Sequence, residues 1–283
     1  MSGVPRAIDV LHLGRPNVIA CFQQGPVIVD PGPGVCLPAL LAALGGEQPE
    51  AILLTHIHLD HAGATGALVQ RWPDVRVVVH ERGARHIVDP SKLVASATRL
   101  YGDDMARLWG EIVPVPEANL VVVGDAARIE DFGGPWRVAY APGHASHHVA
   151  YLHEPSGTLF AGDVAGVRIG AGPVLPPTPP PDIDVEAWRA SAALLRGWDA
   201  ERVAVTHFGV YDDVAAQLDE LVATLEVLSE VAARTDAAGF AEAVRGIVRR
   251  GGEPALADAM FQAMPPDTLW YGLDRYWRTR AGG

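Results

Sequence analysis

The stretch His56–His61 constrains this chain more than any other, because it places three histidines and an aspartate within six residues directly after the apolar run AILLT. Neutral imidazoles and carboxylates are ligands of borderline cations such as Zn²⁺. If a β-strand ends at Thr55, His56 and His58 lie on one side of the chain, since residues two apart in an extended chain share a face. The stretch therefore predicts a metal site at the end of a strand. A solvated loop that is merely rich in histidine is the alternative.

Three more residues of metal-binding type follow apolar strands later in the chain. His144 comes after WRVAYAPG, Asp163 ends TLFAGD, and His207 ends RVAVTH. Strand ends gather the loops that carry active sites, so we expect these side chains to meet the first cluster. Taken singly, each has an ordinary explanation, because an aspartate after a strand is commonly a turn or cap residue.

Strands and helices alternate along most of the sequence. Apolar runs bounded by Gly and Pro predict strands at 7–13, 17–22, 26–32, 51–56, 75–80, 119–125, 136–143, 148–154, 158–163 and 202–207. Helices are predicted at 37–46, 63–72 and 91–110. After the Pro-rich residues 172–184 helical signals dominate except for the strand at 202–207, and everything from Tyr211 onward is predicted to be helical. The pattern predicts an α/β fold in which two αβ halves form a catalytic domain, residues 1–210. A helical extension, residues 211–283, follows it.

The helical extension carries one apolar stripe, whose residues recur every three or four positions. They are Val214, Leu218, Leu221, Leu225, Leu228 and Val231. Such a stripe either packs on the catalytic domain or forms the interface of a homodimer. Both interpretations are open from the sequence.

Charge and composition argue against several classes of partner. The chain has 34 acidic and 22 basic residues and a net charge of -12, which opposes nucleic-acid binding because that requires a concentrated positive field. No apolar run approaches a membrane-spanning helix and the N-terminal residues lack the signal-peptide pattern, so we expect no membrane association. Cys21 and Cys36 lack CxxC spacing. A disulfide framework is therefore not indicated, and a cytoplasmic location is the expectation.

The set HxHxDH, His144, Asp163 and His207 resembles the metallo-β-lactamase superfamily across about residues 8–210. The resemblance implies an αββα sandwich with a dinuclear metal site at one edge. It also implies the ligands: His56, His58 and His144 would hold the first metal, and Asp60, His61 and His207 the second, with Asp163 bridging. The segment VIVDPGPG resembles an early motif of the family and would make Asp30 a supporting residue. An ordinary turn aspartate is the alternative.

A pair of divalent cations supplies the chemistry of a hydrolase. Two such ions about 3.5–4 Å apart lower the pKa of a shared water, which then serves as the nucleophile, and polarise a carbonyl or phosphoryl oxygen. We expect two Zn²⁺ ions, with Mn, Fe or Co able to replace them. Asp60 could accept a proton from the shared water or only hold the second metal. His147 and His148 are expected to support or pack near the site rather than bind metal.

Asp163 indicates which branch of the superfamily the chain resembles. Zinc β-lactamases, as a family, do not use an aspartate at the bridging position. Asp163 therefore points to hydroxyacylglutathione hydrolases, lactonases and phosphodiesterases, and to a promiscuous hydrolase of small ester, thioester, lactone or phosphoester substrates. A mononuclear iron enzyme of the persulfide dioxygenase type, a β-lactamase and a metal-binding protein without activity are the alternatives.

The variable segments are the expected source of substrate selection. Residues 90–110 predict a helical insertion over the site, and the Pro-rich residues 166–184 predict a stiff loop leaving it. The candidate pocket residues are Tyr101, Trp109, Arg168 and Tyr211, with ordinary packing or surface charge as the alternative. Their aromatic and aliphatic character suits a small-molecule substrate.

Overall fold

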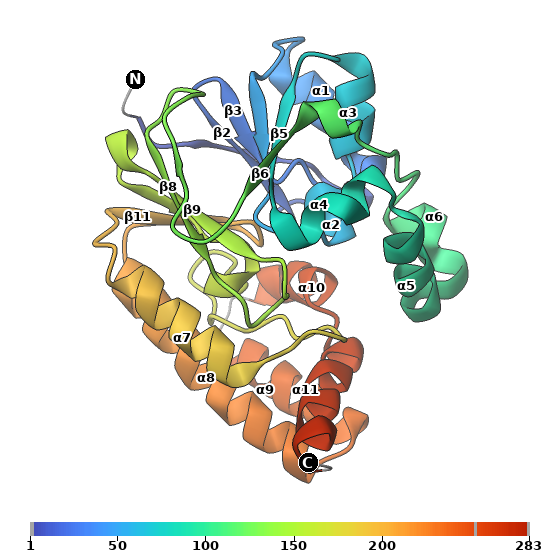
Figure 1. The fold of residues 1–283 in the computed structure, drawn as a ribbon. Helices are drawn as coiled ribbons and strands as arrows, with labels where there is room; N and C mark the ends of the chain where they lie inside the picture. Colours follow the sequence, from blue (N-terminus) through green and yellow to red (C-terminus); the bar gives the residue numbers. More distant parts are fainter. Residues whose placement is uncertain (1–2, 252–253, 282–283) are drawn as a thin grey trace.

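The computed structural model describes residues 3–251 and 254–281, and its strands form two sheets that pack face to face (Figure 1). One sheet contains β1 (Arg6–Asp9), β2 (Ala20–Gln24), β3 (Val27–Val29), β4 (Ala51–Leu53), β5 (Arg76–His80) and β6 (Leu120–Val123), in that order. The other contains β7 (Arg128–Ile129), β8 (Trp136–Tyr140), β9 (Val149–His153), β10 (Thr158–Phe160), β11 (Arg202–Val205) and β12 (Gly209–Tyr211), also in sequence order. Strands β3 to β6 are parallel, as are β10 and β11.

Alternation of side chains along the strands builds the core between the two sheets. In β3, Val27 and Val29 belong to the buried cluster between the sheets, whereas Ile28 belongs to the cluster beneath the helices. Trp136 and Phe160 enter the inter-sheet cluster from the second sheet. Because residues two apart share a face, even a three-residue strand contributes to both cores.

Helices cover the outer faces of both sheets (Figure 1). The first sheet carries α1 (Leu37–Leu44), α2 (Leu59–Ala62), α3 (Thr65–Arg71) and α4 (Glu81–Val88), while α5 (Ser91–Tyr101) and α6 (Met105–Leu108) project away from this layer. The second carries α7 (Val185–Arg196) and α8 (Val214–Arg234). This arrangement confirms the predicted α/β class and the αββα sandwich with C-terminal helices.

The C-terminal helices pack on the αββα layers through α7 (Figure 1). Helix α8 lies along α7, and α9 (Ala237–Gly251), α10 (Pro254–Ala263) and α11 (Pro266–Ala281) complete the group. The stripe residues Leu218, Leu221, Leu225 and Leu228 are at most 1% exposed. The stripe is therefore part of this chain's own core, and a homodimer would have to use another surface. Within the described ranges, none of the helices combines the length and the apolar character needed to cross a bilayer.

Most of the predicted strands end earlier in the structure than expected, and two of them bear on the site. The strand predicted at 51–56 ends at Leu53, so His56 and His58 lie in the following loop and strand alternation does not place them. The strand predicted at 7–13 ends at Asp9, because Leu11 and Leu13 adopt left-handed conformations around a short 3₁₀ turn.

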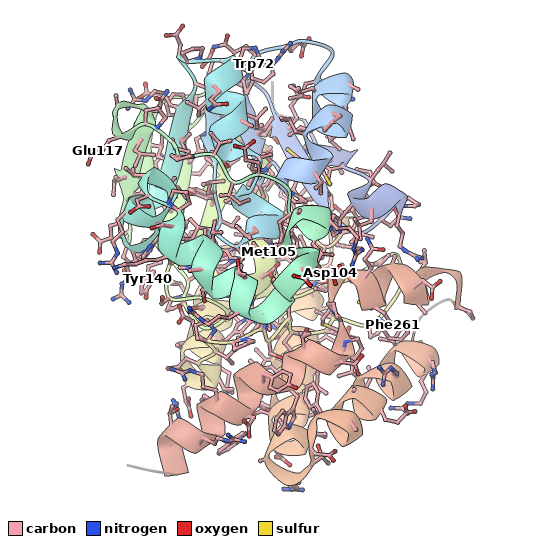
Figure 2. All side chains as sticks on the ribbon, turned by 90° about the vertical axis from the view of Figure 1, so that its right-hand side faces the viewer. Trp72, Asp104, Met105, Glu117, Tyr140 and Phe261 are labelled. Carbon is pink, nitrogen blue, oxygen red and sulfur yellow. The ribbon has the colours of Figure 1, made fainter. Side chains whose placement is uncertain are left out.

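Two predictions about helices were also wrong in detail. The helix predicted at 91–110 breaks at Gly102, whose positive φ of 53° few other residues adopt. The break produces an arm of two helices, α5 and α6, which crosses the front of Figure 2 between the αβ layers and the C-terminal helices. The helical extension does not begin at Tyr211, which ends β12; α8 begins at Val214.

Helix α3 approaches the segment that follows α6 without room for a side chain at Gly66. A Cβ at this position would overlap the carbonyl oxygen of Val113, and the position is buried. We expect Gly66→Ala to lower the free energy of unfolding by about 2 kcal/mol, because overpacking outweighs the gain in helix propensity. Gly124→Ala, at a position with open space around it, is the control. Chemical denaturation of both variants checks this, and equal stabilities would contradict the close approach.

Candidate metal centre

Seven side chains from four strand ends converge at one edge of the sandwich. They are His56 and His58 after β4, Asp60 and His61 in α2, His144 after β8, Asp163 after β10 and His207 after β11. Their nitrogen and oxygen atoms form three groups, within each of which the atoms lie within 4.8 Å of one another: His56–His58–His144, His56–His61–Asp163 and Asp60–His61–His207. The structure thus brings together all seven residues that the sequence predicted as ligands.

Three imidazoles make up the first group. His58 Nδ1 lies 3.0 Å from His56 Nε2 and 2.9 Å from His144 Nε2. Burial lowers the pKa of His56 well below its usual value and that of His58 to about 4, so both rings are neutral near pH 7. A neutral ring carries one N–H, so His58 Nδ1 cannot donate to both neighbours. A cation among the three nitrogens would accept all three lone pairs.

The group Asp60–His61–His207 combines one carboxylate with two imidazoles. Asp60 Oδ2 lies 3.3 Å from His207 Nε2 and 3.8 Å from His61 Nε2. Burial opposes ionisation of Asp60, but the imidazoles of His61 and His207 outweigh it and lower the pKa of its carboxyl below the usual range. The charges of Asp163, Asp60 and Asp30 likewise outweigh burial and raise the pKa of His61 well above its usual value. This subsite therefore concentrates negative charge that attracts a cation.

Asp163 reaches both groups, with one oxygen toward each. Its Oδ2 lies 3.3 Å from His144 Nε2, while its Oδ1 lies 3.2 Å from His61 Nε2 and 3.7 Å from His207 Nε2. Although close, His61 Nε2 and Asp163 Oδ1 are buried and have no partner of hydrogen-bond geometry among the described residues. Buried polar atoms are rarely left unpaired. Two such atoms facing each other fit a site that binds a cation between them.

Asp30 supports the segment His56–His61 through buried hydrogen bonds. Its fully buried carboxylate accepts hydrogen bonds from the Thr55 amide (2.8 Å), the Thr55 hydroxyl (2.7 Å), the Thr206 hydroxyl (2.9 Å) and His61 Nδ1 (2.8 Å). Since the Thr55 proton goes to Asp30, the Thr55 oxygen accepts from His56 Nδ1 at 3.1 Å. Both rings then turn Nε2 toward the site. Asp30 thus occupies the supporting position predicted for it.

Backbone carbonyls orient the two remaining Nε2 ligands. His144 Nδ1 donates to the oxygen of Pro177 and His207 Nδ1 to the oxygen of Val18, both at 2.8 Å. A ring whose Nδ1 carries the proton presents a lone pair at Nε2. The tautomer of each ligand is therefore set by a second contact outside the site.

His147 and His148 lie beside the ligand groups but belong to none of them. His148 is fully buried and stacks against His56, with ring centroids 4.8 Å apart. The Nδ1 atom of His147 accepts from the Ile57 amide at 3.4 Å. Both contacts support the ligand loop, in keeping with the supporting or packing role predicted for these residues.

The candidate pocket residues divide into two pairs. Tyr101 and Trp109 pack edge to face with centroids 5.1 Å apart, and burial together with the charge of Asp60 raises the pKa of the Tyr101 hydroxyl. They form an aromatic wall on the side of Asp60. Arg168 instead pairs with Asp213 at 2.8 Å and lies over the Tyr211 ring at 4.2 Å. The contacts of Arg168 and Tyr211 are therefore those of packing and surface charge pairing, which the sequence offered as the alternative to a pocket role.

His12 is a residue near the site that sequence reasoning missed. It is 3% exposed, stacks on Trp109 with centroids 5.6 Å apart, and donates through Nε2 to the oxygen of Leu108 at 2.9 Å. Gln262 of α10 donates to the His12 carbonyl at 2.8 Å. His12 thus joins three segments beside the metal centre. A lone histidine between two leucines carries no spacing signal that could have revealed this.

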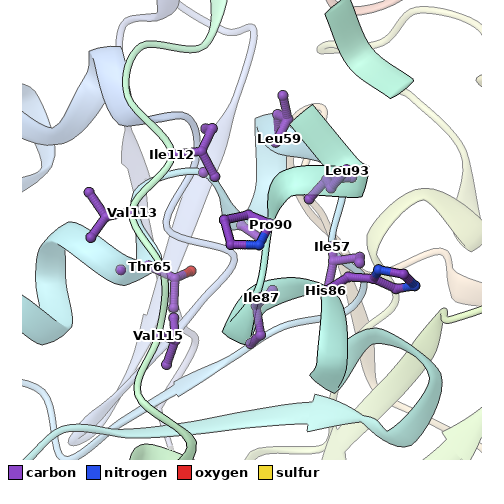
Figure 3. Close-up of a pocket in the computed structure, with 13 residues that line it drawn as sticks. Ile57, Leu59, Thr65, His86, Ile87, Pro90, Leu93, Ile112, Val113 and Val115 are labelled. Atoms are coloured by element: carbon purple, nitrogen blue, oxygen red, sulfur yellow. The ribbon is translucent and has the colours of Figure 1, made fainter. Parts of the chain in front are cut away.

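The ligand loop is held in place by its apolar residues. Ile57 and Leu59 alternate with His56, His58 and Asp60 and are 1% and 5% exposed. They line an apolar hollow beneath α3, α4, α5 and the segment 112–115 (Figure 3). The alternation inferred from the sequence is therefore real, but it belongs to a loop whose two faces have opposite chemistry.

Known proteins resemble the chain in sequence and in fold. ST1585 of Sulfurisphaera tokodaii, a metallo-β-lactamase fold-containing protein, is 32% identical over 177 residues, 61% of this chain and 64% of that protein. Hydroxyacylglutathione hydrolase of Yersinia pestis is 31% identical over 162 residues, 57% of this chain and 51% of the hydrolase. The matches thus span between about half and two thirds of these relatives.

Solved structures share the whole arrangement of elements. The structure of ST1585 superposes with a TM-score of 0.73 at 24% identity, covering 95% of this chain and 97% of that one. TTHA1429 of Thermus thermophilus superposes with a TM-score of 0.66 at 23% identity, covering 98% and 94%. The sequence profile of the metallo-β-lactamase superfamily matches residues 18–207, which include all seven clustered ligands. The chain belongs to the metallo-β-lactamase superfamily.

Proposed function

We propose that the protein is a dinuclear zinc hydrolase of small ester, thioester, lactone or phosphoester substrates, and that it accepts more than one of these classes. The observation that carries the proposal is the placement of Asp163, with one carboxylate oxygen toward each group of histidines. The likeness to hydroxyacylglutathione hydrolase supports hydrolysis of a carboxyl derivative.

Two divalent cations bound at these groups supply Lewis acidity for the substrate oxygen and lower the pKa of a nearby water. The chain's own residues prepare that chemistry. Asp60 stays ionised beside His61 and His207, so it can hold a cation or accept a proton but cannot act as an acid. Its side chain is 22% exposed, the most open of the carboxylates in the site. The substrate therefore reaches the centre on the Asp60 side.

The surroundings of Asp60 favour uncharged, partly apolar substrates. The aromatic wall of Tyr101 and Trp109 stands on this side, and His12 stacks behind it. The chain's net charge of -12 disfavours long polyanions. Apolar walls around a few polar groups are typical of small-molecule sites. The proposed substrates therefore join a short polar reacting group to an apolar portion.

Zinc is the proposed metal, although the donor set also accepts iron, manganese or cobalt. Imidazole and carboxylate ligands suit all four ions. The superfamily protein TTHA1623, which superposes with a TM-score of 0.56 at 26% identity, has been solved in a di-iron-bound form. Iron is thus the metal against which the zinc proposal has to be tested.

We expect gently purified protein to hold two divalent ions per chain, because the site offers two subsites and a carboxylate that reaches both. Elemental analysis of protein produced with balanced trace metals measures both their number and their identity. If the protein held two irons and still hydrolysed its substrates, iron would take the place of zinc in the proposal and the hydrolytic mechanism would stand. A single iron without a second ion would instead favour the oxygenase alternative.

Removal of the Asp163 carboxylate, which reaches both groups, should remove the link between the two metal subsites. We expect Asp163→Ala to lower the affinity for the metal pair and to reduce turnover by more than about 100-fold, since even supporting residues of metal sites contribute 10–100-fold. The fold should persist, as judged by circular dichroism. Asp212→Ala, which removes a carboxylate that is 89% exposed, is the control. Full activity of the Asp163 variant would show that this residue is only a strand-end cap.

Substrate preference follows from charge and from the bridging aspartate. At fixed metal content and salt, we expect kcat/KM to be highest for a small ester, thioester or lactone, intermediate for an aryl phosphodiester, and low for a carbapenem and for structured RNA. A panel of these compounds measures the order. If RNA came first, the charge argument would fail; if the carbapenem came first, the argument from Asp163 would fail.

A further inference from the structure

The Pro-rich loop between Gly172 and α7 lies against the segment that carries His144. Its residue Pro177 provides the carbonyl oxygen that accepts from His144 Nδ1 at 2.8 Å. His144 is 1% exposed, and this is the contact that orients its ring. The position of the Pro177 peptide therefore decides where His144 Nε2 points.

Helix α11 holds this loop through backbone contacts. The hydroxyl of Thr178 donates to the Leu269 carbonyl at 2.9 Å, and Arg275 Nε donates to the Pro181 carbonyl at 3.2 Å. Between them lies Gly272, where a Cβ would overlap the carbonyl oxygen of Thr178 and lie 2.8 Å from Ile183 Cγ1. The helix therefore rests directly on the Thr178–Pro179 peptide, the next peptide after the one whose oxygen accepts from His144.

The three α11 positions share one face of the helix. Leu269, Gly272 and Arg275 are three residues apart, and such residues are neighbours on a helix surface. Leu269 is 2% exposed and Thr178 is fully buried, so the contact excludes water. The loop cannot shift toward α11, and the hydroxyl of Thr178 opposes a shift away from it.

We propose that α11 positions the metal ligand His144 by holding Thr178 and the Thr178–Pro179 peptide, which directly follow the Pro177 carbonyl, and that the C-terminal helices are in this way part of the metal-binding machinery. Gly272 and Thr178 are the positioning residues. Helix α11 lies outside residues 18–207, the part of the chain matched by the family profile. The inference rests on the proposed function in one respect, namely that His144 binds a metal.

The effect should be confined to one of the two subsites. His144 belongs to the group with His56 and His58. His61 and His207 of the other group are oriented by Asp30 and by the Val18 carbonyl, and within the described residues neither of these forms a hydrogen bond with α11. A displaced loop should therefore loosen one ion and leave the other tightly bound.

The first test is Gly272→Ala, which pushes the Thr178 peptide away from the helix. Metal-free protein is titrated with Zn²⁺ in competition with a chromophoric chelator, which resolves the two binding steps without any assay of activity. We expect the affinity of one step to fall about 10–100-fold and that of the other to stay within a factor of about three. Gly246→Ala in α9 is the matched control, because its Cβ would meet only the flexible end of Arg250.

A second pair of variants keeps the test independent of folding. Thr178→Val removes the hydrogen bond to Leu269 while keeping the side-chain shape, and Thr178→Ser keeps the hydroxyl. We expect the valine variant to show the same selective loss of one Zn²⁺ step and the serine variant to retain wild-type affinity. A general destabilisation would weaken both steps and would not be rescued by serine.

The outcomes separate the inference from the proposed function. If the unmodified protein binds two ions and the folded Gly272→Ala and Thr178→Val variants bind both with unchanged affinity, the role of α11 is refuted and the dinuclear site stands. Equal weakening of both steps also refutes it, because the effect would then be structural. If the unmodified protein binds fewer than two ions, the proposed dinuclear function is refuted, and the inference about α11 is refuted with it.

Discussion

The carboxylate of Asp30 is the interaction on which the metal centre depends most. It accepts from Thr55 and His61 near the end of β4 and from Thr206 at the end of β11, so it joins the two sheets at the edge where the ligands meet. Asp30 itself has a positive φ of 50°, a conformation that aspartate tolerates better than most residues. A buried charge with four donors has no other arrangement of comparable energy. The supporting carboxylate, rather than the ligands, therefore sets the geometry.

Local patterns predicted the alternation of strands and helices and the residues of ligand type at strand ends, whereas the αββα sandwich and the roles of the seven ligands were implied by the resemblance to the metallo-β-lactamase superfamily. Strands bounded by Gly and Pro gave the order of elements, and ligand types at strand ends indicated the edge where they meet. His144, Asp163 and His207 follow β8, β10 and β11 as expected. These predictions needed only the direction of each strand and the chemistry of the residue after it.

What the sequence could not predict depends on contacts between distant segments. His12 enters the site because Leu108 and Gln262, about 100 and 250 positions away, supply its partners. The break at Gly102 and the end of β4 at Leu53 follow from backbone conformation, which residue periodicity does not encode. Arg168 looked like a pocket residue because its pairing with Asp213 is visible only in the fold.

The orientation of the histidines has a consequence for how the protein acquires its ions. His56, His61, His144 and His207 each commit Nδ1 to a threonine, a carboxylate or a carbonyl, so folding has already restricted the rings before any ion arrives. Binding of a metal ion then requires little reorganisation of the side chains, because the loss of side-chain entropy has already occurred during folding. The metal-free chain is in this sense a preformed receptor.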